Sequence, residues 1–244
     1  MEIWSSLWNG VKEVASGIGK AISSVLSTSP LMKELLPILA VVIPPPLDAI
    51  ACVAVMGIAS AFGVKSNPDE LGCQMNEADM KPEDFKTFAD YKAYLDREYP
   101  FDAAKYEALS PDQKLACRYT GIIGLMEELN QSKGFKISPM TLGILTAGAA
   151  QCKWTEPQIK GFAEGMARTL EVSGGRDMSS VEGLAKGGLA ADDWTTVRNA
   201  VEKGRETAGV EETIDEICES FKRPEDVERK IDEARAAFDT RDHI

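Results

Sequence analysis

Histidine is almost absent from this sequence of 244 residues, and its absence excludes several kinds of chemistry. The one histidine is His243, next to the C-terminus, where chains are commonly mobile. A Ser-His or Cys-His mechanism and a histidine-bound metal all need an imidazole held by a scaffold. Acidic doublets such as Glu127-Glu128 and Asp192-Asp193 are neighbours on expected helices, so their carboxylates diverge. The sequence therefore predicts no catalytic residue, no metal ligand, no cofactor and no enzyme activity.

Cysteine is present, but in no pattern that binds metal or builds a disulfide framework. The cysteines are odd in number, far apart and without a Cys-x-x-Cys pair: Cys52, Cys73, Cys117, Cys152 and Cys218. We expect free thiols in a reducing cytoplasm. An ordinary signal peptide is also missing, because Glu2 stands where a basic residue belongs. We therefore expect a protein made in the cytoplasm that stays there or leaves without a cleaved signal.

Basic residues are outnumbered by acidic ones, and the formal net charge is −12. Residues 65–244 hold 24 of the 27 basic and 35 of the 39 acidic side chains. No basic stripe offsets this excess, and an acidic surface repels phosphates. Direct binding of nucleic acid is not expected.

Residues 1–29 have the pattern of an amphipathic helix. Apolar side chains recur at helical spacing along one face, and we expect this face to contact a membrane or another copy through Trp4, Leu7, Trp8, Val11, Ile18, Ile22 and Val25. Each glycine of this segment disfavours an isolated helix by about 1 kcal/mol, so the helix needs a partner surface. That surface is a membrane, another copy or the protein's own domain, and these alternatives remain open.

Residues 35–64 are almost wholly apolar and are broken by Pro44-Pro45-Pro46. As a helix, the second arm (47–64) is about 27 Å long, just short of a hydrocarbon core. The first arm (35–43) is too short to cross a bilayer alone. Three interpretations stay open: a helical hairpin buried in a core or an oligomer, a hairpin inserted in a membrane, or a segment that fills the lumen of a larger assembly.

Residues 65–244 carry repeated helix-start signals and few strand signals. Asn67-Pro68 and Gly72 are interpreted as a linker. Caps or prolines with nearby acids then predict helices over 82–99, 110–130, 138–151, 155–172, 179–186, 192–207, 211–221 and 224–238. We predict an all-α fold with an N-terminal amphipathic helix and an apolar helical hairpin (1–64), followed by an acidic multi-helix domain (65–244) with a sub-boundary near 173–190.

The segment Trp8-Asn9-Gly10-Val11-Lys12, in its Ser-rich amphipathic setting, resembles a segment that recurs in phage tail tape-measure proteins. Residues 81–129 are also similar to regions of tail proteins from phages and phage-tail-like particles. Tape-measure proteins are much longer, so the resemblance implies a C-terminal portion that stands alone or is released by processing. It also implies a place in the tail tube or tip, several copies per particle, and membrane contact as genome or cargo passes.

These features lead to one main hypothesis and two alternatives. The main hypothesis is a non-enzymatic structural component of a phage tail or phage-tail-like particle, made in the host cytoplasm and then carried in a virion or particle. Its partners would be other copies of itself, tail tube or tip proteins, and a membrane during delivery. The alternatives are a membrane-permeabilising effector of toxin or holin type, and a soluble helical interaction module with a buried hairpin.

Overall fold

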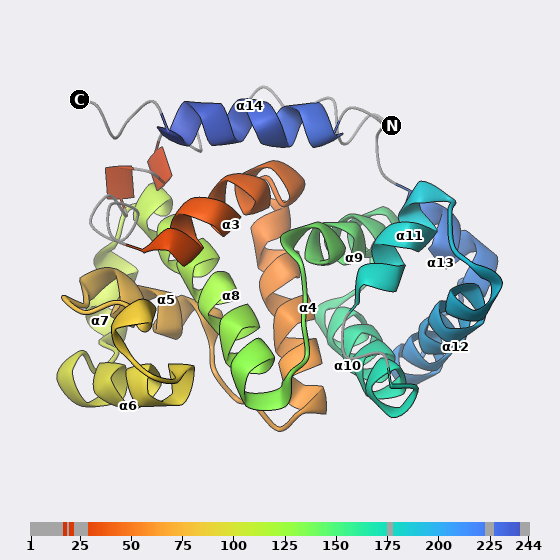
Figure 1. Cartoon of the computed structure of the whole chain (residues 1–244), viewed down its shortest axis with the longest axis horizontal. Helices are drawn as coiled ribbons and strands as arrows, with labels where there is room; N and C mark the ends of the chain where they lie inside the picture. Colours follow the sequence, from red (N-terminus) through yellow and green to blue (C-terminus); the bar gives the residue numbers. More distant parts are fainter. Residues whose placement is uncertain (1–16, 19, 22–28, 175–177, 223–226, 240–244) are drawn as a thin grey trace.

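The computed structural model describes residues 17–18, 20–21, 29–174, 178–222 and 227–239 (Figure 1). Regular structure in these ranges is helical, without a strand, which confirms the predicted all-α fold. The helices before residue 110 are α3 (Pro30–Val42), α4 (Leu47–Ala61), α5 (Pro68–Glu77), the 3-10 helix η1 (Pro82–Asp84), α6 (Phe88–Glu98) and α7 (Ala103–Ala108). Those after it are α8 (Pro111–Lys133), α9 (Pro139–Gln151), α10 (Glu156–Val172), α11 (Ser179–Lys186), α12 (Ala191–Ala208), α13 (Ile214–Ser220) and α14 (Val227–Asp239).

Capping side chains fix the starts of several helices, as the sequence predicts. Ser110 and Gln113 form a capping box at the start of α8, and Thr155 and Gln158 form one at the start of α10. Ser138 caps α9. The side chains of Ser110, Gln113, Ser138 and Gln158 accept hydrogen bonds from backbone N–H groups at these helix starts, which have no partner within the helix. The observed boundaries of α8, α9, α10 and α12 therefore lie close to the predicted ones.

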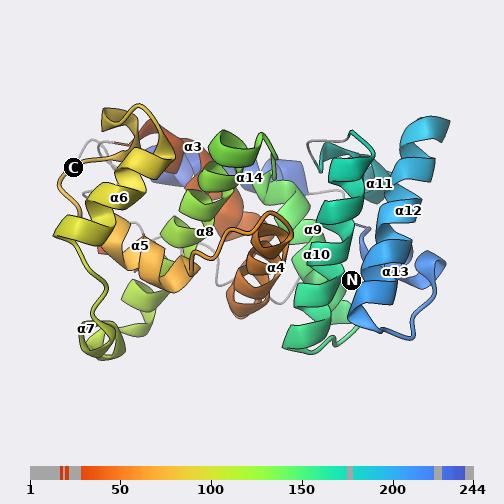
Figure 2. The ribbon, with the colours of Figure 1, turned by 90° about the horizontal axis from the view of Figure 1, so that it is seen from below.

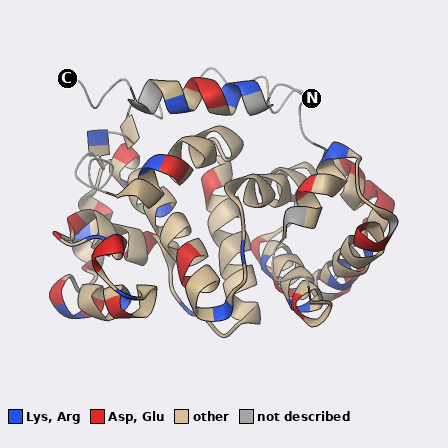
Figure 3. Cartoon of the chain, viewed as in Figure 1, with Lys and Arg blue, Asp and Glu red and all other residues tan. Residues whose placement is uncertain are grey.

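The helices follow one another across the molecule in an order that differs from the sequence. In Figure 2, α5, α8, α4, α10 and α12 lie in succession, and each packs against the next. α9 packs against α3 and α4, and α14 lies across α3 (Figure 1). Charged residues gather on the outer helices, whereas α4 carries one and α9 carries none (Figure 3).

The apolar pair, which we define as α3 and α4, lies in the middle of the hydrophobic core. Leu36, Leu39, Val55 and Ile58 of the pair are buried in the same cluster as residues of α8, α9, α10 and α12. One core thus extends across the predicted boundary at residues 64 and 65. It also extends across the region 173–190, where the buried Val181 of α11 belongs to the cluster.

The segment interpreted as a linker is a helix, and this prediction is wrong. Asn67 caps α5 by accepting a hydrogen bond from the backbone N–H of Asp69 at 2.9 Å. A Cβ added at Gly72 would lie 1.6 Å from the carbonyl oxygen of Cys117, and one added at Gly121 would lie 1.7 Å from that of Pro68. The two glycines bring the backbones of α5 and α8 into contact. Gly72 is therefore required for packing and does not mark a flexible connection.

The region predicted as one helix over 82–99 contains two elements. Phe85 is extended between η1 and α6, and its ring packs against those of Tyr91 and Tyr94, with centroids 5.3 and 5.2 Å apart. Thr87 then caps α6. These aromatic contacts keep Phe85 extended, so the chain does not form one continuous helix here. α7, which the sequence analysis did not predict, begins after the cap Asp102.

No single helix of the described residues is long and apolar enough to cross a membrane. α3 and α4 meet the criteria of length and composition together, as a pair bent by 118° at the proline break. Most residues of both helices are buried within this chain. Of the three interpretations of residues 35–64, the structure thus shows a hairpin packed in the protein's own core.

Candidate functional site at the junction of α4, α5 and α8

A cluster of three charged side chains lies where α4, α5 and α8 meet, and we call it the Arg118 cluster. Arg118 of α8 donates from Nε and Nη2 to the carboxylate of Asp69 of α5, at 3.0 and 3.2 Å. Its Nη1 donates to Asp48 in the first turn of α4. Asp48 is only 6% exposed. Burial alone would lower the pKa of Arg118, but its hydrogen bonds to Asp69 and Asp48 raise it, so the guanidinium stays charged.

Removal of one charge from the Arg118 cluster should destabilise the fold, because the guanidinium and the carboxylates neutralise one another. A buried carboxylate without a partner is strongly unfavourable, whereas one that is paired and hydrogen-bonded is tolerated. The N-terminal position of Asp48 on α4 adds a favourable interaction with the helix dipole. The cluster therefore fixes the start of α4 against both α5 and α8.

Tyr119 binds the other side of the proline break. Its hydroxyl donates a hydrogen bond to the carbonyl oxygen of Ile43, the C-terminal cap of α3. The tyrosine is fully buried, and burial raises its pKa well above the ordinary value. The carbonyl groups at the end of a helix have no partner within the helix. Tyr119 supplies one here and so fixes the end of α3.

The apolar pair is also held at its beginning and on its outer face. Glu83 of η1 accepts hydrogen bonds from the Ser29 hydroxyl at 2.7 Å and from the backbone N–H of Leu31 at 3.2 Å. α14 covers α3 and buries Val227 and Ile231. The pair is thus enclosed by contacts that come from distant parts of the sequence.

A pair of thiols lies beside the Arg118 cluster, and we call Cys73 of α5 and Cys117 of α8 the thiol pair. Interaction between the two thiols raises the pKa of Cys73 and lowers that of Cys117. Asn76 Nδ2 also donates to Cys117 Sγ, at 3.7 Å. The interaction with Cys73 and the hydrogen bond from Asn76 both favour negative charge on Cys117. Cys117 is 4% exposed, whereas Cys73 is half-buried.

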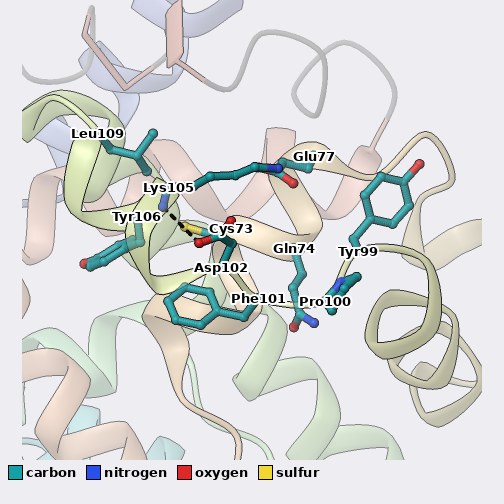
Figure 4. A pocket seen from close by; sticks show the side chains of 10 residues that line it. All are labelled: Cys73, Gln74, Glu77, Tyr99, Pro100, Phe101, Asp102, Lys105, Tyr106 and Leu109. Atoms are coloured by element: carbon teal, nitrogen blue, oxygen red, sulfur yellow. Dashed lines mark hydrogen bonds between the residues drawn. The ribbon is translucent and has the colours of Figure 1, made fainter.

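Cys73 is also part of the lining of a small pocket between α5 and α7 (Figure 4). The other lining residues come from α5, from the α6–α7 loop and from α7: Gln74, Glu77, Tyr99, Pro100, Phe101, Asp102, Lys105, Tyr106 and Leu109. Asp102 is committed to capping α7, because it accepts from the backbone N–H groups of Ala104 and Lys105. Burial, followed by the charge of Asp69, raises the pKa of Tyr106.

The chemistry at this junction is that of a thiol and an ion pair. In the described part of the chain, no group of His, Cys, Asp or Glu side chains could hold a metal ion. Glu77 and Lys105 also line the pocket, and the negative charge of Glu77 opposes ionisation of both thiols by raising their pKa. The sequence analysis did not identify the Arg118 cluster or the thiol pair. Arg118 lies 70 residues from Asp48, and no local pattern indicates a contact over that distance.

Of the residues predicted to contact a membrane or another copy, the described ranges include Ile18 alone. Ile18 is fully buried and belongs to the hydrophobic core. The other six lie outside the described residues: Trp4, Leu7, Trp8, Val11, Ile22 and Val25.

Comparison with protein-family models, with curated proteins and with solved structures finds no match to this chain.

Proposed function

We propose that this chain is a non-enzymatic component of a phage tail or phage-tail-like particle, and that it contacts a membrane during delivery. The particle assignment rests on the resemblance of residues 8–12 and 81–129 to tail proteins. The proposed partners are other copies of the chain, tail tube or tip proteins, and a membrane. The observation that supports membrane contact is the apolar pair, which is stored inside an acidic helical protein and fixed at its break by Arg118 and Tyr119.

The apolar pair would leave the core only for another apolar environment. Burying one Leu, Ile or Val side chain stabilises the fold by about 1.5 to 3 kcal/mol, and the pair buries many such residues, among them Leu36, Leu39, Val42, Val55 and Ile58. Exposure of these side chains to water is therefore strongly unfavourable. A bilayer replaces the lost contacts, because its hydrocarbon interior is as apolar as the core.

The dimensions of the pair favour a re-entrant insertion. α4 has 15 residues, so it is about 22 Å long, which is shorter than the hydrocarbon core of about 30 Å. Its single charged side chain, Asp48, lies in the first turn, next to the proline break. A bent pair of this length would enter one leaflet while Asp48 stays near the polar headgroups.

Flotation of the full chain with neutral phosphatidylcholine vesicles tests membrane contact. Neutral lipid is the appropriate surface, because anionic headgroups repel a chain of net charge −12. We expect the wild-type chain to float, and Arg118→Leu to float in a larger fraction because the start of α4 is no longer fixed. Arg168→Leu is the matched control, since Arg168 is exposed and, within the described residues, pairs only with Glu164 on its own helix. Its flotation should equal that of the wild type.

Two outcomes would overturn membrane contact by the apolar pair. Failure of both the wild type and Arg118→Leu to float would exclude membrane contact under these conditions. Equal flotation of the wild type, Arg118→Leu and Arg168→Leu would assign binding to another segment. A Trp4→Ser, Trp8→Ser double variant of the full chain then measures the contribution of residues 1–29. The particle assignment is tested by mass spectrometry of purified particles from the source organism, where the chain should occur at a fixed ratio to tube protein.

The same buried pair also favours a second candidate, a membrane-permeabilising effector. The two candidates differ in what the isolated chain does to a closed vesicle. Release of an entrapped dye by the purified chain alone would favour the effector, whereas flotation without dye release would favour the particle component. A chain that neither floats nor releases dye would favour the third candidate, a soluble helical interaction module.

A further inference from the structure

We infer that Cys73 and Cys117 form a reversible dithiol–disulfide site, which small organic disulfides reach through the pocket between α5 and α7. The site joins α5 and α8. Among the described glycines, a Cβ added at Gly72 or Gly121 would lie nearest to another backbone, so these two helices are in the closest contact. Formation of the disulfide requires no rearrangement of the helices.

The packing of α5 on α8 places the two cysteines together. A disulfide requires Cα atoms within about 7 Å of each other, a separation that only closely packed helices provide. Gly72 precedes Cys73 and brings its backbone against that of Cys117. Asn76, one turn after Cys73, reaches the Cys117 sulfur with its side-chain amide at 3.7 Å. Cys73 lies between these two contacts on α5, and its interaction with Cys117 raises the pKa of the Cys73 thiol.

The two sulfurs have different access to a reagent. Cys73 lines the pocket and is half-buried, so it is the more accessible of the two thiols. Cys117 is almost fully buried and lies behind Cys73 on α8. This arrangement assigns the first reaction to Cys73 and the second to Cys117. Thiol–disulfide exchange depends on access in this way as well as on acidity.

The reaction is an exchange with a small disulfide, R–S–S–R. The Cys73 sulfur bonds to one sulfur of the reagent, the reagent S–S bond breaks, and the released R–S⁻ takes up the Cys73 proton. The Cys117 sulfur then bonds to the Cys73 sulfur, the bond between Cys73 and R–S breaks, and the second R–S⁻ takes up the Cys117 proton. The protein loses two hydrogen atoms, that is two protons and two electrons, and one R–S–S–R becomes two R–SH. An excess of R–SH reverses both steps.

The three other cysteines serve as internal references for this site. Cys52 is buried on α4, and burial raises its pKa. Burial also raises the pKa of Cys152 and of Cys218. Within the described residues, no other cysteine is among the groups that shift the pKa of any of the three. They should therefore form no intramolecular disulfide.

Oxidation of the folded, full chain with oxidised glutathione tests the site. After alkylation of the remaining thiols and tryptic digestion without reductant, we expect one cross-linked species that joins the peptide containing Cys73 to residues 115–118. The intact protein should lose two hydrogens and stay monomeric, and dithiothreitol should restore both thiols. The midpoint of thermal unfolding should rise by several degrees on oxidation, because the bond closes a long loop.

Single variants separate this site from non-specific oxidation. Cys73→Ser should prevent the cross-link and all glutathione attachment at Cys117, whereas Cys117→Ser should stop the reaction at a stable mixed disulfide on Cys73. Cys152→Ser is the matched control and should oxidise like the wild type. The inference would be overturned by a wild-type cross-link between any other two cysteines, by intermolecular dimers as the main product, or by no reaction at Cys73.

Discussion

Arg118 and Tyr119 are consecutive residues of α8, and they bind the two sides of one break in the apolar pair. Arg118 pairs with Asp48 at the start of α4, while Tyr119 donates a hydrogen bond to the carbonyl of Ile43 at the end of α3. The positions of α3 and α4 therefore depend on the same turn of α8. A displacement of this turn would loosen both helices together.

Arg118→Leu should destabilise the protein by about 3 to 5 kcal/mol, because it leaves Asp48 buried without a counter-charge. Urea unfolding followed by circular dichroism measures the change. Replacing both charges, as in Asp48→Asn with Arg118→Leu, should recover part of the loss. The matched change Arg168→Leu should alter stability by less than about 0.5 kcal/mol, as usual for an exposed ion pair. Equal effects of Arg118→Leu and Arg168→Leu would show that the Arg118 cluster does not hold the junction.

Tyr119→Phe should cost about 1 to 3 kcal/mol, since the Ile43 carbonyl loses its hydrogen-bond donor in a buried place. Tyr91→Phe is a close control: Tyr91 is equally buried, but its hydroxyl has no hydrogen-bond partner within the described residues. This second change should be neutral or stabilising. Both substitutions remove one hydroxyl oxygen, so chemical denaturation of the two variants compares the free energy of unfolding after the same chemical change. A larger loss for Tyr91→Phe would contradict the assignment.

Gly72→Ala should destabilise the protein by about 3 kcal/mol or more, because the added methyl group would collide with the backbone of α8. Gly121→Ala should act in the same way at the other point of contact. Gly188→Ala offers a control, since a Cβ at Gly188 meets open space and the backbone there has no left-handed conformation. Thermal unfolding of the three variants should separate the first two from the third. A wild-type midpoint for Gly72→Ala would show that α5 is not packed as described.

Oxidation of the thiol pair should reduce flotation with phosphatidylcholine vesicles. The disulfide would join α5 to α8 and hold Asp69 beside Arg118, so that the start of α4 is released less readily. The comparison is between reduced and oxidised protein in one flotation experiment, with Cys73→Ser treated in the same way as a control. If the oxidised wild type floats in the same fraction as the reduced protein, the redox site does not affect membrane contact. Each of the two proposals is then tested by its own experiment.

Sequence patterns predict the helices of this protein better than the contacts between them. Caps such as Ser110 and Thr155 act within four residues, so the starts of α8 and α10 can be located from the sequence. Gly72 was misinterpreted because its importance depends on the backbone of Cys117. The hydrogen bond from Tyr119 to Ile43 likewise joins residues 76 positions apart. Each of these contacts is created by the packing of α5 and α4 on α8, which no local pattern encodes.

The position of α14 across α3 has a consequence for synthesis of the protein. Translation must proceed by 185 residues from the end of α3 before α14 begins. At about 5 to 20 residues per second, this takes roughly 10 to 40 s. During that interval the nascent chain presents α3 without its outer cover, close to the ribosome and accessible to chaperones and membranes. The native arrangement is therefore completed only after translation of the C-terminal helix, and the rate of elongation sets how long the face of α3 beneath α14 is exposed to competing partners.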